Sequence, residues 1–198
     1  EFLQAFLAVA QPDRSGDVIV HRVIDGSAKT DSAGNRLASY VQDDISNLAR
    51  VFTGYNYDFS ADTTVTVNYS GTNSDNVRTA NHTKRPMTNT AANHSTLAAS
   101  FLGVTVPANA SAASALTTAL DTLFNHPNVG PFFARQMIQR LVTSNPSPAY
   151  IYRVAEVFAN DGTGTRGNLG AVVRAILTDY EARSPVVAAN PSFGKLKE

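Results

Sequence analysis

The sequence predicts a mainly α fold: a helical bundle that carries a small β-hairpin and an irregular insertion. Apolar residues recur at helical spacing in several segments, whereas residues 17–25 alternate as a half-buried strand does. Residues 55–108 are rich in Asn, Thr and Ser and show few apolar periods. The 198 residues fit a single domain over 1–198, or a fragment of a larger one. A compact chain of this size buries roughly 70% of its unfolded surface, so it needs no metal or disulfide to fold.

The first block, residues 1–54, is expected to form a helix, a loose hairpin and a second helix. The predicted elements are helix 1–10, strand 17–25, return strand 36–40 and helix 41–54. In the last of these, Asp43 and Asp44 suit the positive end of the helix dipole, and Gly54 suits the position just beyond the helix end. Its apolar residues fall at i, i+3, i+4 and i+7: Ile45, Leu48, Ala49 and Phe52.

Residues 55–108 are expected to form an irregular insertion with one short strand near 63–70. Long loops are usually functional or mobile, so this is the region in which we expect a site. His82 and His94 are the candidate ligand-binding residues, with surface polar residues as the simpler interpretation. With nearby carboxylates they could form a site of nitrogen and oxygen ligands, for a metal that the spacing does not identify. These carboxylates are Asp58, Asp62 and Asp75. No catalytic residue is assigned and no cofactor is expected.

Residues 109–184 are expected to form the helical bundle, and residues 185–198 a tail. Ser147 is the expected N-cap of one helix, with Pro148 at its first position, and Asn168 is the expected N-cap of the last clear helix. The residues predicted to face inward are Ala115, Leu116, Ala119, Leu120, Leu123, Phe133, Ala134, Met137, Ile138, Leu141, Ile151, Val154, Ala155, Phe158, Leu169, Val172, Val173, Ile176 and Leu177.

Composition and motifs disfavour several function classes. The chain has no cysteine, which excludes disulfides, thiolate nucleophiles, Fe–S clusters and cysteine-ligated zinc. It has no G-x-S-x-G elbow, no phosphate-binding G-x-x-x-x-G-K-[ST] loop and no G-x-G-x-x-G fingerprint. No apolar run approaches the ~20 residues that span a bilayer, so no transmembrane segment is predicted.

The arginine-bearing helical pair at 124–158, with the helix that follows it, superficially resembles a helix-turn-helix unit. However, the formal net charge is zero, and carboxylates offset the arginines in this part of the chain. We therefore expect a solvated outer face and no nucleic-acid partner. His126 stands just before a helix, and we expect it, together with Asn128, to satisfy helix-end groups rather than to act as a ligand or base.

Several quoted segments, taken together, resemble a bacterial family known as domain of unknown function 1800. "LFNHPNVGPFFARQMIQRLVTSNPSPAYIYRVAEVFANDGTGTRGNLGAVVRAILTDYEAR" is similar to the C-terminal part of that family. "EFLQAFLA", "YVQDDISNLARVFTGY", "RPM", "HSTLAASFLGVTVPA" and "GKLKE" resemble further family segments in the same order. The resemblance covers nearly the whole chain and is specific in combination.

This resemblance implies that the chain is an internal to C-terminal portion of a longer exported protein. The expected location is the periplasm, the cell surface or the medium, and the rest of the parent chain is expected to cover some of the surface. No activity or catalytic residue is established for the family. Many relatives carry a lysine shortly before Phe-Leu-Gly, which "HSTLAAS" lacks, so an anion-binding role for that position is in doubt here.

Two functional hypotheses follow. The first is a cell-envelope or extracellular structural or interaction module with protein partners, favoured by the absence of a catalytic motif and by the zero net charge. The second is an exported hydrolytic or metal-assisted enzyme with its site in residues 55–108.

Overall fold

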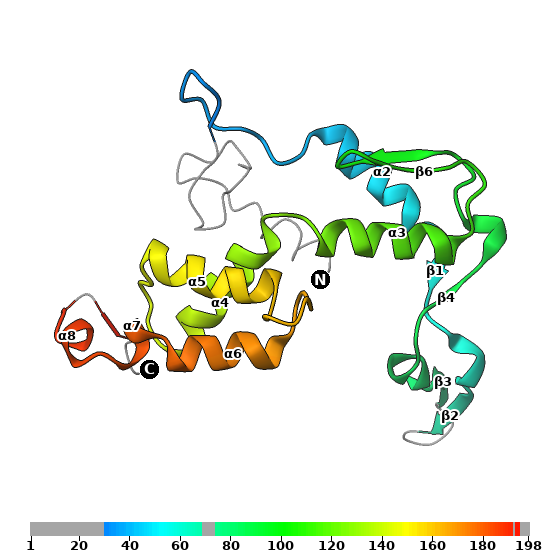
Figure 1. Ribbon diagram of the computed structural model, residues 1–198. Coiled ribbons are helices and arrows are strands. Elements are labelled where there is room, and N and C mark those ends of the chain that lie inside the picture. The colour runs from blue at the N-terminus through cyan, green and yellow to red at the C-terminus, as the bar shows by residue number, and fades with distance from the viewer. Residues whose placement is uncertain (1–29, 69–73, 192, 195–198) are drawn as a thin grey trace. The chain divides into compact units, whose positions relative to one another are not determined.

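The computed structural model describes residues 30–68, 74–191 and 193–194. The chain divides into two compact units, described separately below: unit 1 is Glu1–Val41 with Thr122–Glu198, and unit 2 is Gln42–Asp121. The described residues are mainly helical, as predicted, and they also contain small two-stranded antiparallel sheets (Figure 1). The predicted helix 1–10 and strand 17–25 lie outside the described residues. The prediction of a single domain, or a fragment of one, stays a prediction.

The helices are α2 (Gln42–Val51), α3 (Ala112–Phe124), α4 (Val129–Leu141), α5 (Pro148–Ala159), α6 (Leu169–Thr178), α7 (Tyr180–Arg183) and α8 (Pro185–Ala188). The strands are β1 (Tyr55–Asn56), β2 (Thr64–Asn68), β3 (Ser74–Arg78), β4 (Thr88–Asn89), β5 (Ala99–Phe101) and β6 (Val104–Val106). Three short 3-10 helices are η1 (Phe59–Ala61), η2 (Asn81–Lys84) and η3 (Ala91–Asn93). None of the helices in the described residues is long and apolar enough to cross a membrane. The predicted tail at 185–198 begins with the short helix α8.

The predicted return strand at 36–40 does not form as a continuous strand. Isolated bridge residues occur instead, and Thr30 pairs with Arg36 across a turn. The Asp31 carboxylate closes that turn by accepting the amides of Ala33 and Asn35, each at 2.9 Å. These local side-chain bonds hold the turn between the two bridge residues.

Helix α2 forms where the sequence predicts it and packs along β5 in unit 2. Leu48 and Val51 of α2 are buried, as is Phe101 of β5. Asp44 accepts the amide of Leu102 at 2.8 Å, which ties the β5–β6 turn to the first turn of α2. The predicted inward position of Ala49 is wrong, because Ala49 is exposed and Val51 is buried instead.

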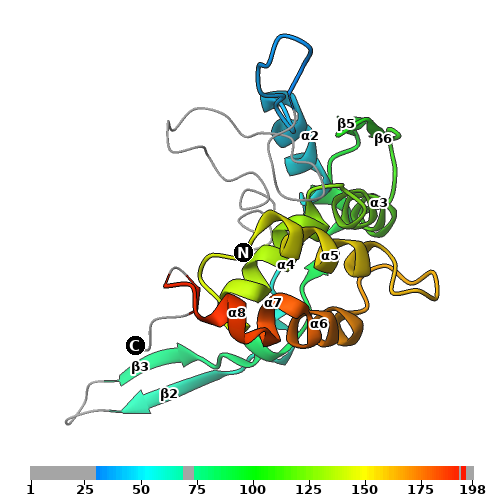
Figure 2. The same cartoon turned by 60° about the vertical axis from the view of Figure 1, so that its left-hand side comes forward.

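The insertion contains more paired backbone than its sequence predicts. Strands β1 and β4 pair, as do β2 with β3 and β5 with β6. Figure 2 shows β2 and β3 as an antiparallel ribbon, in which Val65 lies opposite Val77. Every residue of these two strands is exposed. Strand β2 lies within the strand predicted near 63–70, whereas β3 is short and polar and leaves no apolar period that sequence reasoning can detect.

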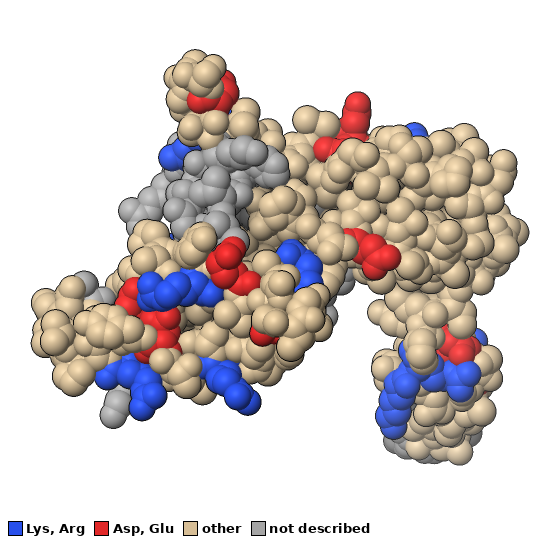
Figure 3. All heavy atoms as spheres, in the orientation of Figure 1, with Lys and Arg blue, Asp and Glu red and all other residues tan. Residues whose placement is uncertain are grey.

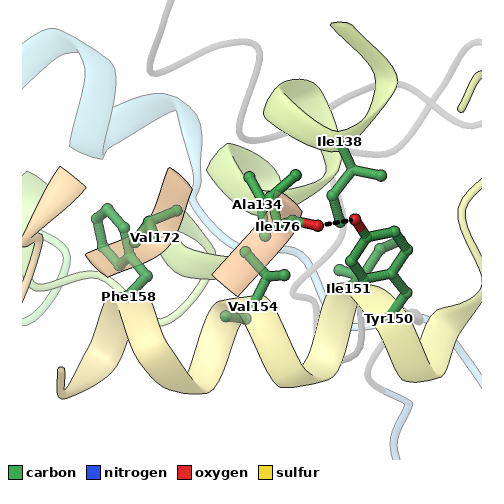
Figure 4. Packing of buried hydrophobic residues seen from close by; sticks show 9 residues of the cluster. Ala134, Ile138, Tyr150, Ile151, Val154, Phe158, Val172 and Ile176 are labelled. Atoms are coloured by element: carbon green, nitrogen blue, oxygen red, sulfur yellow. Dashed lines mark hydrogen bonds between the residues drawn. The ribbon is translucent and has the colours of Figure 1, made fainter. Parts of the chain in front are cut away.

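In unit 1, α4, α5 and α6 pack around one hydrophobic core (Figure 4). The buried members are Ala134, Ile138, Tyr150, Ile151, Val154, Ala155, Phe158, Val172 and Ile176. Ser147 caps α5 by accepting the amide of Tyr150, and Pro148 occupies its first position, as predicted. Asn168 caps α6 by accepting the amide of Ala171, also as predicted. These caps fix where the two helices begin, and therefore which residues reach the core.

Candidate functional site

The insertion places one predicted histidine, His82, against a buried carboxylate. The Asp62 side chain has no solvent exposure. Its Oδ1 accepts the backbone amide of His82 at 2.9 Å, and its Oδ2 accepts ring Nδ1 at 2.7 Å. Burial acts to raise the pKa of Asp62, but the bonds from the His82 ring and amide outweigh it and hold that pKa below its usual value. An ionised carboxylate only accepts hydrogen bonds, so it places the ring proton on Nδ1 and leaves the lone pair of a neutral ring on Nε2.

Two aromatic rings flank His82. The ring centroid of Tyr57 lies 5.3 Å from that of His82, and the centroid of Phe59 lies 4.8 Å away. The Arg78 guanidinium lies 4.7 Å from the centroid of the Phe59 ring. The His82 side chain is 22% exposed, and no described residue bonds to its Nε2. One oriented nitrogen is therefore available to accept a proton or to serve as a single metal ligand.

The remaining carboxylates do not complete a metal centre around His82. Asp58 pairs with Arg85 at 2.6 Å instead. Hydrogen bonds from the Ser60 side chain and amide, and then from Arg85, lower the pKa of Asp58 to about 2. Within residues 30–68, 74–191 and 193–194, no three His, Cys, Asp or Glu side chains gather as ligands would. Asp62 was correctly noted as near His82, whereas Tyr57, Phe59 and Arg78 carried no sequence signal.

The second predicted histidine, His94, lies in a tightly bonded turn. Its Nδ1 lies 3.1 Å from the carbonyl oxygen of Thr53, and the Ser95 amide donates to Thr53 Oγ1 at 2.7 Å. Gly54 has φ of +79°, and a Cβ there would lie 2.9 Å from the backbone nitrogen of His94. Only glycine fits this close approach. The Thr-Gly pair at the end of "ARVFTGY" therefore has a structural role, and no hydrogen bond or ring contact joins His94 to His82 among the described residues.

A shallow hollow lies beside His94. Its lining includes Arg50, Val51, His94, Leu97, Ala99 and Val106, and its empty volume of about 210 Å³ includes open solvent. Pockets for drug-sized ligands measure about 300–1,000 Å³, so this hollow is too small for one. Arg50 is also held in place, by Asn47 Oδ1 at 2.7 Å and the carbonyl of Ala98 at 3.1 Å.

The apolar face of α6 is wider than the core that covers it. Val172 and Ile176 are fully buried, as predicted. Leu169 and Leu177 were also predicted to face inward, but they are 53% and 50% exposed, and Val173 is only partly buried. These three side chains, Leu169, Val173 and Leu177, form what we call the α6 edge. Leu120 and Leu141 are two further predicted inward residues that are exposed.

The basic residues around the helical pair divide into two groups. Arg153 binds Asp179 through two bonds of 2.8 Å and Glu181 through one of 3.0 Å. Arg174 and Arg183, by contrast, form no ion pair with any described residue. Figure 3 shows arginine side chains along the rim of unit 1 beneath α6 and α7.

Arg166 is also bonded within unit 1, since its guanidinium donates to the carbonyls of Phe124 and His126 and lies over the ring of Phe158. His126 Nδ1 accepts the amide of Asn128 at 3.2 Å, so the structural interpretation of His126 is confirmed. Asn128 lies at the N-cap of α4 without a side-chain capping bond, and its carbonyl accepts the amide of Phe132 at 3.1 Å. These contacts indicate that Arg166 and His126 serve packing within unit 1 and do not form a phosphate-binding surface.

Comparison with known proteins gives one match. A family described as a protein of unknown function, DUF1800, matches residues 28–198. No curated protein and no solved structure gives a significant match. The match covers most of the chain, including α2, the insertion and every helix that is described in unit 1. The chain belongs to the DUF1800 family.

Proposed function

We propose that this chain is an exported interaction module, which acts by packing the α6 edge against another protein. The observation that carries the proposal is the half-exposure of Leu169 and Leu177 on a helix whose adjacent positions are fully buried. Contiguous exposed apolar surface with polar residues at its rim is typical of interaction sites. Burying the exposed halves of two leucines contributes about 1.5–3 kcal/mol to association.

The rest of the chain is consistent with this role. Among the residues that the structure describes, neither histidine environment contains a recognised set of nucleophile, base and oxyanion donors. The cysteine-free and weakly charged composition is compatible with an extracytoplasmic location. The exposed valines of the β2–β3 hairpin add a second apolar surface, in unit 2.

We propose in addition that the chain is part of a longer exported protein, and the test uses that intact parent protein in its own cells. A photo-crosslinking residue replaces Leu177 in one variant and the exposed Leu97 of unit 2 in a control. We expect a discrete crosslink to a second protein from position 177 that is weak or absent from position 97. A monodisperse parent without partners, or a crosslink from 177 to the parent chain itself, would contradict the proposal. Cell fractionation of the parent tests its location independently.

A second candidate function, an exported hydrolytic or metal-assisted enzyme, is favoured by the Asp62–His82 pair alone. A buried carboxylate that orients an imidazole is how enzymes prepare a general base and how proteins orient a metal ligand. If this function exists, His82→Gln abolishes the activity of the parent and keeps its fold, whereas His94→Gln, at a structural position, mainly lowers stability. Elemental analysis of the purified parent tests the metal-assisted form, because a stoichiometric metal that is lost in His82→Gln would support it.

A further inference from the structure

The α6 edge has the length and shape of a helix-binding strip. Leu169, Val173 and Leu177 are spaced at i, i+4 and i+8, so they lie on successive turns of one face. The strip is about 12 Å long, since each residue from Leu169 to Leu177 advances the helix by about 1.5 Å. It borders the buried residues Val172 and Ile176, so the exposed leucines continue a packed surface rather than standing alone.

Two arginines on α6 and α7 carry positive charge that no described carboxylate pairs. Arg174 lies on α6 next to the strip in the helical projection, and Arg183 lies on the following helix, α7. Neither has an ion-pair partner among the described residues. The carboxylates of Asp179 and Glu181, which could have neutralised them, are bound by Arg153.

The state of Asp179 supports this account. Burial acts to raise its pKa, but the hydrogen bonds from Arg153 and from the Glu181 amide outweigh burial and lower it, so Asp179 stays ionised and paired. The sequence of residues 122–194 contains six arginines and four carboxylates. The excess positive charge is therefore present in this part of the chain and gathers along the rim beneath α6 and α7 (Figure 3).

We propose that the α6 edge binds an acidic amphipathic helix of a partner protein. This inference rests on the proposed function and names the chemistry of the partner. Apolar residues of the partner at i, i+3, i+4 and i+7 would cover Leu169, Val173 and Leu177. Carboxylates that flank those residues would meet Arg174 and Arg183 at the rim. A second copy of this chain is a poor occupant, because symmetric pairing would bring like charges together at the same rim.

The experiment measures binding of two synthetic peptides to the 198-residue chain by fluorescence anisotropy. Each peptide is a stapled helix of about 14 residues, long enough to span the strip, with leucines at i, i+3, i+4 and i+7. One peptide carries Glu at the flanking positions and the other carries Lys. We expect the Glu peptide to bind about tenfold tighter than the Lys peptide at low salt, with a smaller preference at high salt.

Four variants assign the binding to the proposed residues. Leu177→Gln should weaken binding of the Glu peptide about tenfold, because the substitution removes half-exposed apolar surface from the strip. The double variant Arg174→Gln with Arg183→Gln should remove the preference between the peptides. The matched controls, Leu97→Gln in unit 2 and Arg135→Gln on α4, should leave both affinities unchanged. Circular dichroism confirms that each variant keeps its fold.

The possible results separate this inference from the proposed function. Equal binding of both peptides, lost in Leu177→Gln, would overturn the acidic partner but leave an interaction surface. No binding of either peptide, or equal weakening in Leu97→Gln, would overturn the α6 edge as a helix-binding strip. A concentration-dependent dimer in analytical ultracentrifugation that is lost in Leu177→Gln would assign the edge to a second copy instead.

Discussion

Removal of one hydroxyl, in Tyr150→Phe, tests whether the core of unit 1 holds α5 and α6 together as the structure shows. Tyr150 is fully buried, and its hydroxyl donates to the carbonyl of Ile176 at 2.6 Å (Figure 4). Ile176 lies in the last turn of α6, where carbonyls have no amide partner further along the helix. Burial, and then the charges of Asp179 and Glu181, raise the pKa of Tyr150, so its hydroxyl stays protonated and remains a donor.

The expected loss follows from that bond. Tyr150→Phe keeps the ring and its packing but leaves the Ile176 carbonyl buried without its donor, which costs about 1–3 kcal/mol. A loss of about 1.5 kcal/mol lowers the melting temperature of a chain of this size by about 3–6 °C. The neighbouring exposed residue Tyr152 supplies the matched control, because no described residue bonds to its hydroxyl.

The assay is thermal and urea unfolding of the 198-residue chain and of both variants, followed by circular dichroism. We expect Tyr150→Phe to lower the unfolding midpoint. Tyr152→Phe should leave the free energy of unfolding within about 0.5 kcal/mol of that of the unsubstituted chain. Equal midpoints for all three proteins would refute the assignment of the Tyr150–Ile176 bond as a stabilising contact in the core.

Two further predictions concern unit 2. Gly54→Ala should destabilise it by about 3 kcal/mol or more, because positive φ costs about 1–2 kcal/mol and the added Cβ also meets the backbone of His94. Gly103→Ala is the control, since Gly103 has the same φ of +79° but no atom lies within 4 Å of an added Cβ. Equal losses of stability for the two variants in urea unfolding would contradict the role of the contact with His94. The lowered pKa of Asp58, about 2, means that its stabilisation is fully present above the unfolded value near 4 and is lost as the pH falls through about 2. The free energy of unfolding measured at pH 5, 3 and 2 should show this loss of stability, and the loss should be smaller in Ser60→Ala. An unchanged loss in Ser60→Ala would contradict the role of Ser60 in lowering the pKa of Asp58.

Sequence reasoning located the helices of unit 1 well because their local signals are strong. Ser147 and Asn168 accept the amides that they were expected to accept, and both helices begin beside them. Caps depend on atoms within three residues of one another, so the chain itself specifies them. The same reasoning placed Val154, Phe158 and Ile176 in the core, because period and burial agree there.

The candidate site was less accessible to such reasoning. His82 and His94 were singled out by type and region, but their roles differ because of partners distant in sequence. Asp62 lies 20 residues before His82, and Thr53 lies 41 residues before His94. No spacing rule relates such residues, since their approach depends on how polar strands and 3-10 turns pair in space.

Local residue patterns are enough to specify the mainly α class, the helix starts and the apolar period of α6. Tertiary structure alone decided which part of that period the core covers. The sequence marks Leu169, Val172, Ile176 and Leu177 equally as apolar, yet only Val172 and Ile176 meet α4 and α5. A helix has one face of limited width turned toward its neighbours, so apolar residues at the margin stay exposed unless another surface covers them.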